Sequence, residues 1–128
     1  PMGGIIARDG LEFKKSEHGS TFAGGPVACA AGLATLRVIE NVLPDVPKKG
    51  ERFRAGLAQY NPRVRGLMVG ISVGDKCPDV QKQCFNKGVI VNCAADGNLR
   101  LVPPLTITDA EIDRAVGVLN GALGSAQL

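Results

Sequence analysis

The 128-residue chain has no tryptophan, one tyrosine, four phenylalanines and a single histidine. Because rings are scarce, aliphatic side chains must fill most of its core. No Ser/His/Asp or Cys/His signature for nucleophilic catalysis surrounds the single histidine. Neither a Walker loop nor a Gly-x-Gly-x-x-Gly turn occurs. The chain therefore lacks the parts of a self-contained enzyme.

No Cys-x-x-Cys spacing occurs among the four cysteines, which are Cys29, Cys77, Cys84 and Cys93. With one histidine beside them, we expect no zinc site and no other bound metal. Nothing in the spacing indicates a disulfide framework, which favours a reducing, cytoplasmic location. Cys29 falls in an alanine-rich predicted helix, where we expect a buried free thiol.

Charge is also modest, because the net charge is +3 and the basic residues are scattered. Nucleic-acid binding would need a basic stripe with interleaved aromatics, so we expect no nucleic-acid partner. No apolar run approaches the roughly 18–20 residues of a membrane span, so no membrane partner is expected. No signal peptide is visible. The chain begins at Pro1 without an initiator methionine, and we expect its natural start to lie elsewhere.

Hydrophobic periodicity and turn signals predict strands interspersed with helices. The expected strands cover residues 2–7, 64–73, 89–91 and 99–102, and the expected helices cover residues 27–42, 48–60, 78–86 and 109–123. Asp96-Gly97 predicts a hairpin turn. Thr108 and Glu111 have the spacing of a capping box. We predict an α+β fold, a small sheet covered by helices, in which residues 1–43 precede a small domain of residues 44–128.

The most informative segment runs from His18 to Pro26, with the sequence His-Gly-Ser-Thr-Phe-Ala-Gly-Gly-Pro. The hydroxyls of Ser20 and Thr21 and the free backbone N–H groups precede a helix that Pro26 opens. Such a helix start suits an anion, phosphate first. The alternative is that Ser20 and Thr21 merely cap or turn the chain. The residues alone thus indicate an α+β domain with a candidate anion site.

This segment resembles the His-Gly-Ser-Thr-Phe-Gly-Gly-Asn-Pro turn of class III aminotransferases, which depend on pyridoxal phosphate. Three further segments are similar to that family and follow in its order, namely residues 1–7, 64–70 and 99–108. Together they cover nearly the whole chain. The similarity is greatest to the C-terminal third of acetylornithine and ornithine aminotransferases. It implies the C-terminal small domain of fold type I pyridoxal-phosphate-dependent transferases.

The resemblance implies roles for three residues. Thr21 matches the threonine that donates its hydroxyl to the cofactor phosphate of the neighbouring subunit. Ser20 matches the adjacent serine, which lies near the substrate. Arg100 matches the arginine that holds the substrate α-carboxylate, a task that suits a planar guanidinium. Without the resemblance, Arg100 would be interpreted as a solvated residue on an edge strand, and we expect His18 to be structural.

Two replacements depart from the family's turn. Ala23 stands in place of a glycine, and it would restrict the backbone if that position needed a positive φ. Gly25 stands in place of an asparagine and removes a hydrogen-bonding side chain. Both replacements fall next to the residues that are expected to face the phosphate.

The family's cofactor lysine would lie before Pro1, and its aspartate for the pyridine nitrogen would lie further upstream. We therefore assign no catalytic residue and do not expect this chain to catalyse transamination alone. In an intact enzyme, the resemblance implies a homodimer that transfers the amino group of N-acetylornithine or ornithine to 2-oxoglutarate, in arginine biosynthesis. The alternative is a stand-alone, non-catalytic binding or assembly domain of the same fold.

Overall fold

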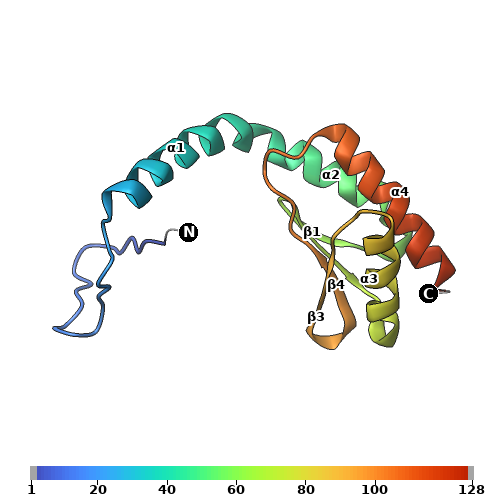
Figure 1. The fold of residues 1–128 in the computed structure, drawn as a ribbon, viewed down its shortest axis with the longest axis horizontal. Helices are drawn as coiled ribbons and strands as arrows, with labels where there is room; N and C mark the ends of the chain where they lie inside the picture. Colours follow the sequence, from blue (N-terminus) through green and yellow to red (C-terminus); the bar gives the residue numbers. More distant parts are fainter. Residues whose placement is uncertain (1–2, 127–128) are drawn as a thin grey trace. The chain divides into compact units, whose positions relative to one another are not determined.

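A computed structural model describes residues 3–126 of the chain. The chain divides into two compact units, one up to Asn41 and the other from Val42 onward. Figure 1 labels their helices and strands.

The first unit contains turns followed by one helix, α1 (Pro26–Val42). The helix starts at Pro26, which confirms the predicted helix. Residues 3–7 form no strand, so the strand expected over residues 2–7 is wrong for its described part, and Met2 lies outside the described residues. A strand needs a hydrogen-bonding neighbour, and the described residues of this unit supply none.

The apolar residues of α1 recur at helical spacing, which predicts one broad buried face, but the helix has no buried residue. Cys29 is only half-buried, so the expectation of a buried thiol is also wrong. Exposed aliphatic side chains of this helix include Val27, Leu33 and Leu36. The prediction failed because an apolar face is buried only where another element covers it.

One helical stretch, Pro26–Gly56, is long and apolar enough to cross a membrane by length and composition alone. This corrects the expectation that no segment approaches that length. The same test is passed by the core helices of soluble proteins. The stretch carries Arg37 and Glu40 within α1, and its most apolar window has no buried residue in this chain.

The second unit is a four-stranded antiparallel sheet with helices. Its strands are β1 (Arg63–Arg65), β2 (Met68–Ser72), β3 (Asn92–Ala94) and β4 (Asn98–Leu101), in the spatial order β1-β2-β4-β3. Its α-helices are α2 (Val46–Gly56), α3 (Cys77–Asn86) and α4 (Asp109–Ser125). In Figure 1 the three helices lie on one side of the sheet. The predicted α+β class is confirmed.

Two strand predictions were wrong. Residues 64–73 form a hairpin rather than one strand, because the chain turns at Gly66, whose φ is +57°. Residues 89–91 form no strand, and pairing begins only at Asn92. In contrast, the Asp96-Gly97 turn is confirmed, since both residues have the positive φ that tight hairpins require.

The core lies between the helices and one face of the sheet. The central strands alternate, with Val69 and Ile71 of β2 and Leu99 and Leu101 of β4 buried. The helices add Phe53, Leu57, Val80, Cys84, Ile112, Leu119 and Leu123. Fully burying one such aliphatic side chain contributes about 1.5–3 kcal/mol. Phe53 is the one ring in the buried core of residues 3–126, which confirms an aliphatic core.

Cys77 and Cys93 form a disulfide, with their α-carbons 5.8 Å apart. The expectation that the cysteines stay unpaired is therefore wrong for this pair. Cys77 begins α3 and Cys93 lies in β3, so the fold of α3 onto the sheet brings them together. Cys84 remains a buried free thiol, and burial raises its pKa.

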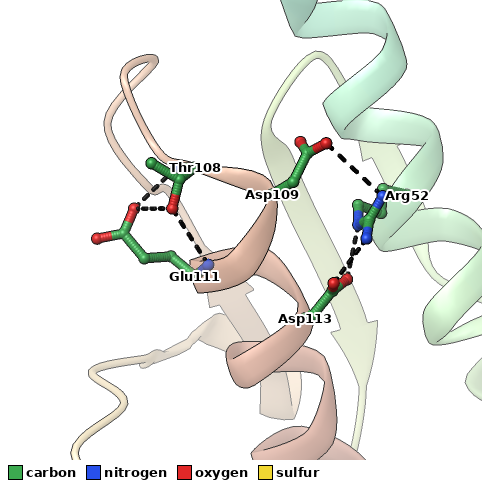
Figure 2. A network of polar contacts seen from close by, with 5 residues as sticks. All are labelled: Arg52, Thr108, Asp109, Glu111 and Asp113. Atoms are coloured by element: carbon green, nitrogen blue, oxygen red, sulfur yellow. Dashed lines mark hydrogen bonds and ion pairs between the residues drawn. The ribbon is translucent and has the colours of Figure 1, made fainter.

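Polar contacts join α2 to α4 at the surface (Figure 2). The Arg52 guanidinium donates two hydrogen bonds of 2.6 Å to the Asp113 carboxylate and lies 3.7 Å from Asp109. These contacts raise the pKa of Arg52 and lower the pKa of Asp113. The predicted capping box is confirmed, because Thr108 Oγ1 accepts from the Glu111 N–H at 3.3 Å and Glu111 Oε2 accepts from the Thr108 N–H at 2.8 Å.

Replacing Gly50 should destabilise the second unit. A Cβ on this buried residue would lie 2.3 Å from the backbone oxygen of Gly66, so α2 would have to move away from the β1–β2 turn. We expect Gly50→Ala to lower the free energy of unfolding by about 1–3 kcal/mol. The control is Gly117→Ala in α4, where the new Cβ meets open space. This variant should raise the free energy of unfolding by about 0.5–1 kcal/mol. Urea unfolding measures the stability of both variants. Equal stabilities would contradict the close contact between Gly50 and Gly66.

Glu111 should contribute to the pH dependence of stability. Its hydrogen bonds with Thr108 lower its pKa in the folded chain. Its contribution is therefore complete above the unfolded pKa, about 4.3, and is lost as the pH falls through the folded value. We expect Glu111→Gln to have a lower free energy of unfolding than the parent at pH 7. The difference between the two should become smaller towards pH 3. Thermal unfolding across this range tests it, with Glu40→Gln as control, and a gap independent of pH would exclude the carboxylate's role.

Candidate functional site

The predicted phosphate-binding turn lies in the first unit, just before α1. Residues 21–24 form a turn in which the Ala23 N–H donates to the Ser20 carbonyl oxygen at 3.3 Å. Ser20 and Thr21 are both exposed. Gly24 takes the positive φ, +73°, and Ala23 does not. Alanine at position 23 is therefore compatible with the turn, and the departure from the family's glycine introduces no backbone strain.

The first turn of α1 supplies backbone donors to the same place. The first helical hydrogen bond of this turn joins the Cys29 N–H to the Gly25 carbonyl at 2.9 Å. The N–H groups of Val27 and Ala28 precede it and have no partner within the helix. No acidic side chain lies in the first turn, so the positive end of the helix dipole is not neutralised there. Residues 21–28 line a shallow hollow of about 570 Å³.

The His18 ring contacts Phe13 rather than the start of α1. Its ring stacks on Phe13 with a centroid distance of 5.0 Å. This contact supports the expected structural role.

Arg100 lies on β4 in the second unit. It is opposite Gly70 of β2 on one side and Asn92 of β3 on the other. Its neighbours Leu99 and Leu101 point into the core, so Arg100 projects from the opposite, exposed face. The edge-strand interpretation of Arg100 is wrong, because β4 lies between two strands.

We call this exposed side of the sheet the open face. Its residues are Arg63, Arg65, Met68, Gly70, Ser72, Asn92, Ala94, Asn98 and Arg100. A hollow of about 460 Å³ lies over it. Arg63 is the member that sequence reasoning missed, because the expected strand began at residue 64. The alternation Arg63-Val64-Arg65 was the signal that could have found it.

The structure brings Arg100 together with Arg63, Gly70 and Asn98 on one face. Ser20 and Thr21 belong to the first unit and Arg100 belongs to the second. Among residues 3–126, no cluster of His, Cys, Asp and Glu could hold a metal ion.

Residues 4–123 match the model of the class III aminotransferase family, and the chain belongs to this family. The resemblance drawn from the sequence is thereby confirmed.

Among curated relatives, the chain is 43% identical to the acetylornithine aminotransferase of Methanosarcina mazei, over 95% of the chain and 33% of that protein. It is 38% identical to the acetylornithine aminotransferase of Aquifex aeolicus, over 96% of the chain and 34% of that protein. The chain thus spans about a third of the length of these relatives.

Among solved structures, ornithine aminotransferase from Toxoplasma gondii superposes with a TM-score of 0.78 at 27% identity, over 89% of this chain and 30% of that one. That structure is described as having partial occupancy of pyridoxal phosphate at its active site. A transaminase from the marine bacterium Virgibacillus has a TM-score of 0.80 at 22% identity, over 90% and 32%, and shows the same fold.

Proposed function

We propose that this chain is the C-terminal part of a pyridoxal-phosphate-dependent aminotransferase acting on N-acetylornithine or ornithine, with 2-oxoglutarate as amino acceptor. The observation that carries the proposal is the 43% identity to an acetylornithine aminotransferase over 95% of the chain. In this proposal, residues 1–43 carry the phosphate-binding turn and residues 44–128 form the small domain. The intact protein is a homodimer that serves arginine biosynthesis.

Arg100 binds the α-carboxylate of the substrate. Its guanidinium is exposed and makes no ion pair within the described part of the chain. Gly70 opposite it has no side chain, and the Arg63 guanidinium lies over that position, so the ligand would meet a second cation there. A carboxylate fits the guanidinium through two parallel N–H···O bonds.

Thr21 and the start of α1 bind the phosphate of pyridoxal phosphate. The residues fit that group, because an exposed hydroxyl and unpartnered backbone N–H groups border one hollow without a nearby acid. Ser20 lies next to Thr21, on the side of the substrate. When bound, the cofactor supplies an electron-accepting ring that stabilises charge on the substrate carbon. The lysine that holds the cofactor belongs to the rest of the enzyme.

The apolar surface of α1 packs, in this proposal, against the rest of the enzyme and its partner subunit rather than against lipid. Exposed Val27, Leu33 and Leu36 are the residues such packing would cover. We further propose a cytoplasmic location, without membrane or nucleic-acid partners. Because Cys77 and Cys93 form a disulfide, the cysteines do not support a reducing location. The proposed location therefore rests on the similarity to acetylornithine aminotransferases.

Replacing Arg100 should lower the catalytic efficiency with the amino donor. We consider a chimaera in which this chain replaces the matching C-terminal third of the Methanosarcina mazei enzyme. The chimaera should transfer amino groups from N-acetylornithine to 2-oxoglutarate, and Arg100→Gln should lower kcat/KM roughly a hundredfold, because two charge-assisted bonds are lost. Arg37→Gln, on α1, is the charge-matched control. A folded, cofactor-loaded chimaera without activity would favour the non-catalytic alternative.

Replacing Thr21 should weaken cofactor binding. In the same chimaera, Thr21→Val removes one hydroxyl donor to the phosphate, and we expect the Kd for pyridoxal phosphate to rise about tenfold. Thr35→Val is the matched control, because the Thr35 hydroxyl donates to the Ala31 carbonyl within α1. Absorbance titration measures both. Equal cofactor affinity in the two variants would remove Thr21 from the phosphate site.

A further inference from the structure

The Cys77–Cys93 disulfide joins α3 to β3, a strand at the edge of the sheet. Cys77 is the first residue of α3, and Cys93 is the middle residue of β3. Cys93 pairs with Leu99 of β4, which is fully buried, so Cys93 lies on the face of the sheet that the helices cover. The disulfide therefore fastens an edge strand to a helix.

The sheet itself holds β3 only weakly. Among the described strands, β3 pairs with β4 alone, and this pairing covers three residues, Asn92–Ala94. Strands of about five or six residues are usual, and a two-stranded pair without further support is marginal in water. Gln81 Nε2 in α3 also donates to the Val91 carbonyl at 2.9 Å, just before the strand. The position of β3 thus depends on its ties to α3.

The two sulfurs of the disulfide differ in their access to solvent. Cys77 is 2% exposed, whereas Cys93 is half-buried on the edge strand. A small thiol can therefore reach Cys93 more readily than Cys77. Disulfides of cytoplasmic proteins are usually transient or redox-sensing, because cellular thiols reduce them. In the cytoplasmic location proposed above, this disulfide is expected to open and close reversibly.

We propose that the Cys77–Cys93 disulfide is a redox-sensitive clamp, whose reduction releases β3 from β4. The thiolate of a small thiol attacks the Cys93 sulfur, the bond between the two cysteines breaks, and Cys77 leaves as a thiolate that takes up a proton. A second small thiol then attacks the mixed disulfide and frees Cys93. Two small thiols become one disulfide while the chain gains two thiols, and the reverse exchange closes the clamp.

Release of β3 changes the position of Arg100 in the sheet. With the clamp closed, β4 lies between two strands, and Asn92 of β3 is opposite Arg100. With β3 released, β4 becomes an edge strand, and its backbone groups on that side lose their partners. The clamp thus decides whether Arg100 lies inside the sheet or at its edge. This inference rests on the disulfide and the strand register and holds whatever ligand Arg100 binds.

Alkylation of the 128-residue chain by iodoacetamide tests the clamp. Cys77 and Cys84 are both buried in α3, but Cys84 is a free thiol that does not contact a disulfide partner. Mass spectrometry gives their rates, each divided by the rate of the same thiol in urea. After reduction by dithiothreitol, Cys77 should react at least about thirtyfold faster than Cys84, because release of β3 is a local opening. Cys84 reports opening of the whole helix, so a general loss of stability on reduction affects both thiols.

Two variants and a second measurement separate release of β3 from fraying at the start of α3. Cys93→Ala removes the partner of Cys77, which should then react without reductant, within about twofold of its rate in the reduced parent. Cys29→Ala removes a free thiol of the first unit and should leave Cys77 unreactive until reductant is added. On reduction, nuclear Overhauser contacts between β3 and β4 should be lost, while those between β2 and β4 remain.

Four results would overturn the inference. Alkylation of Cys77 and Cys93 in the air-oxidised chain would show that no disulfide forms. Equal rates for Cys77 and Cys84 in the reduced chain would show that β3 stays in place. Contacts between β3 and β4 that persist after reduction would assign the exposure of Cys77 to the helix start alone. Loss of the β2–β4 contacts as well would show that reduction unfolds the whole unit rather than releasing one strand.

Discussion

The alternation of residues along β2 and β4 is the constraint on which this structure depends. Each strand directs aliphatic side chains to the helices, and apart from Met68 it directs small or polar ones to the open face. A shift of one residue in the register would bury Arg100 and expose Leu99 and Leu101. The same alternation that buries the core therefore places Arg100 on the open face, where we propose that it binds a carboxylate.

The two units differ in how complete they are. The second has a closed aliphatic core, a capped α4 and a polar link between Arg52 and Asp113 that joins two helices (Figure 2). The first has α1 with no buried residue and exposed turns before it. Isolated helices of this length are marginal in water, so α1 would need an apolar neighbour to become stable. The turn that we propose to bind phosphate belongs to this first unit.

Local signals predicted the parts of the fold that local chemistry decides. Thr108 and Glu111 indicated the start of α4, Pro26 that of α1, and Asp96-Gly97 the β3–β4 turn. Features that depend on distant neighbours were missed. The burial of α1, the pairing of residues 2–7 and the Cys77–Cys93 disulfide all require knowledge of what lies alongside in space.

The candidate site divides in the same way. Ser20, Thr21 and Arg100 came from the family resemblance, since an exposed hydroxyl or arginine has no distinctive local signal, and their roles remain proposals. Arg63 was missed because the turn at Gly66 splits the expected strand and sets the register that places Arg63 beside Gly70. Only the register of three strands shows that Arg63, Gly70 and Arg100 lie in one row across the sheet.

The central claim is that the second unit folds by itself and the first contributes residues to a site completed by the rest of an enzyme. Backbone hydrogen exchange of the monomeric 128-residue chain tests this claim most directly. The account predicts that β2 and β4 amides exchange at least about a hundredfold more slowly than those of α1, which should approach the rates of unstructured chain. Protection of α1 equal to that of β2 and β4 would contradict it.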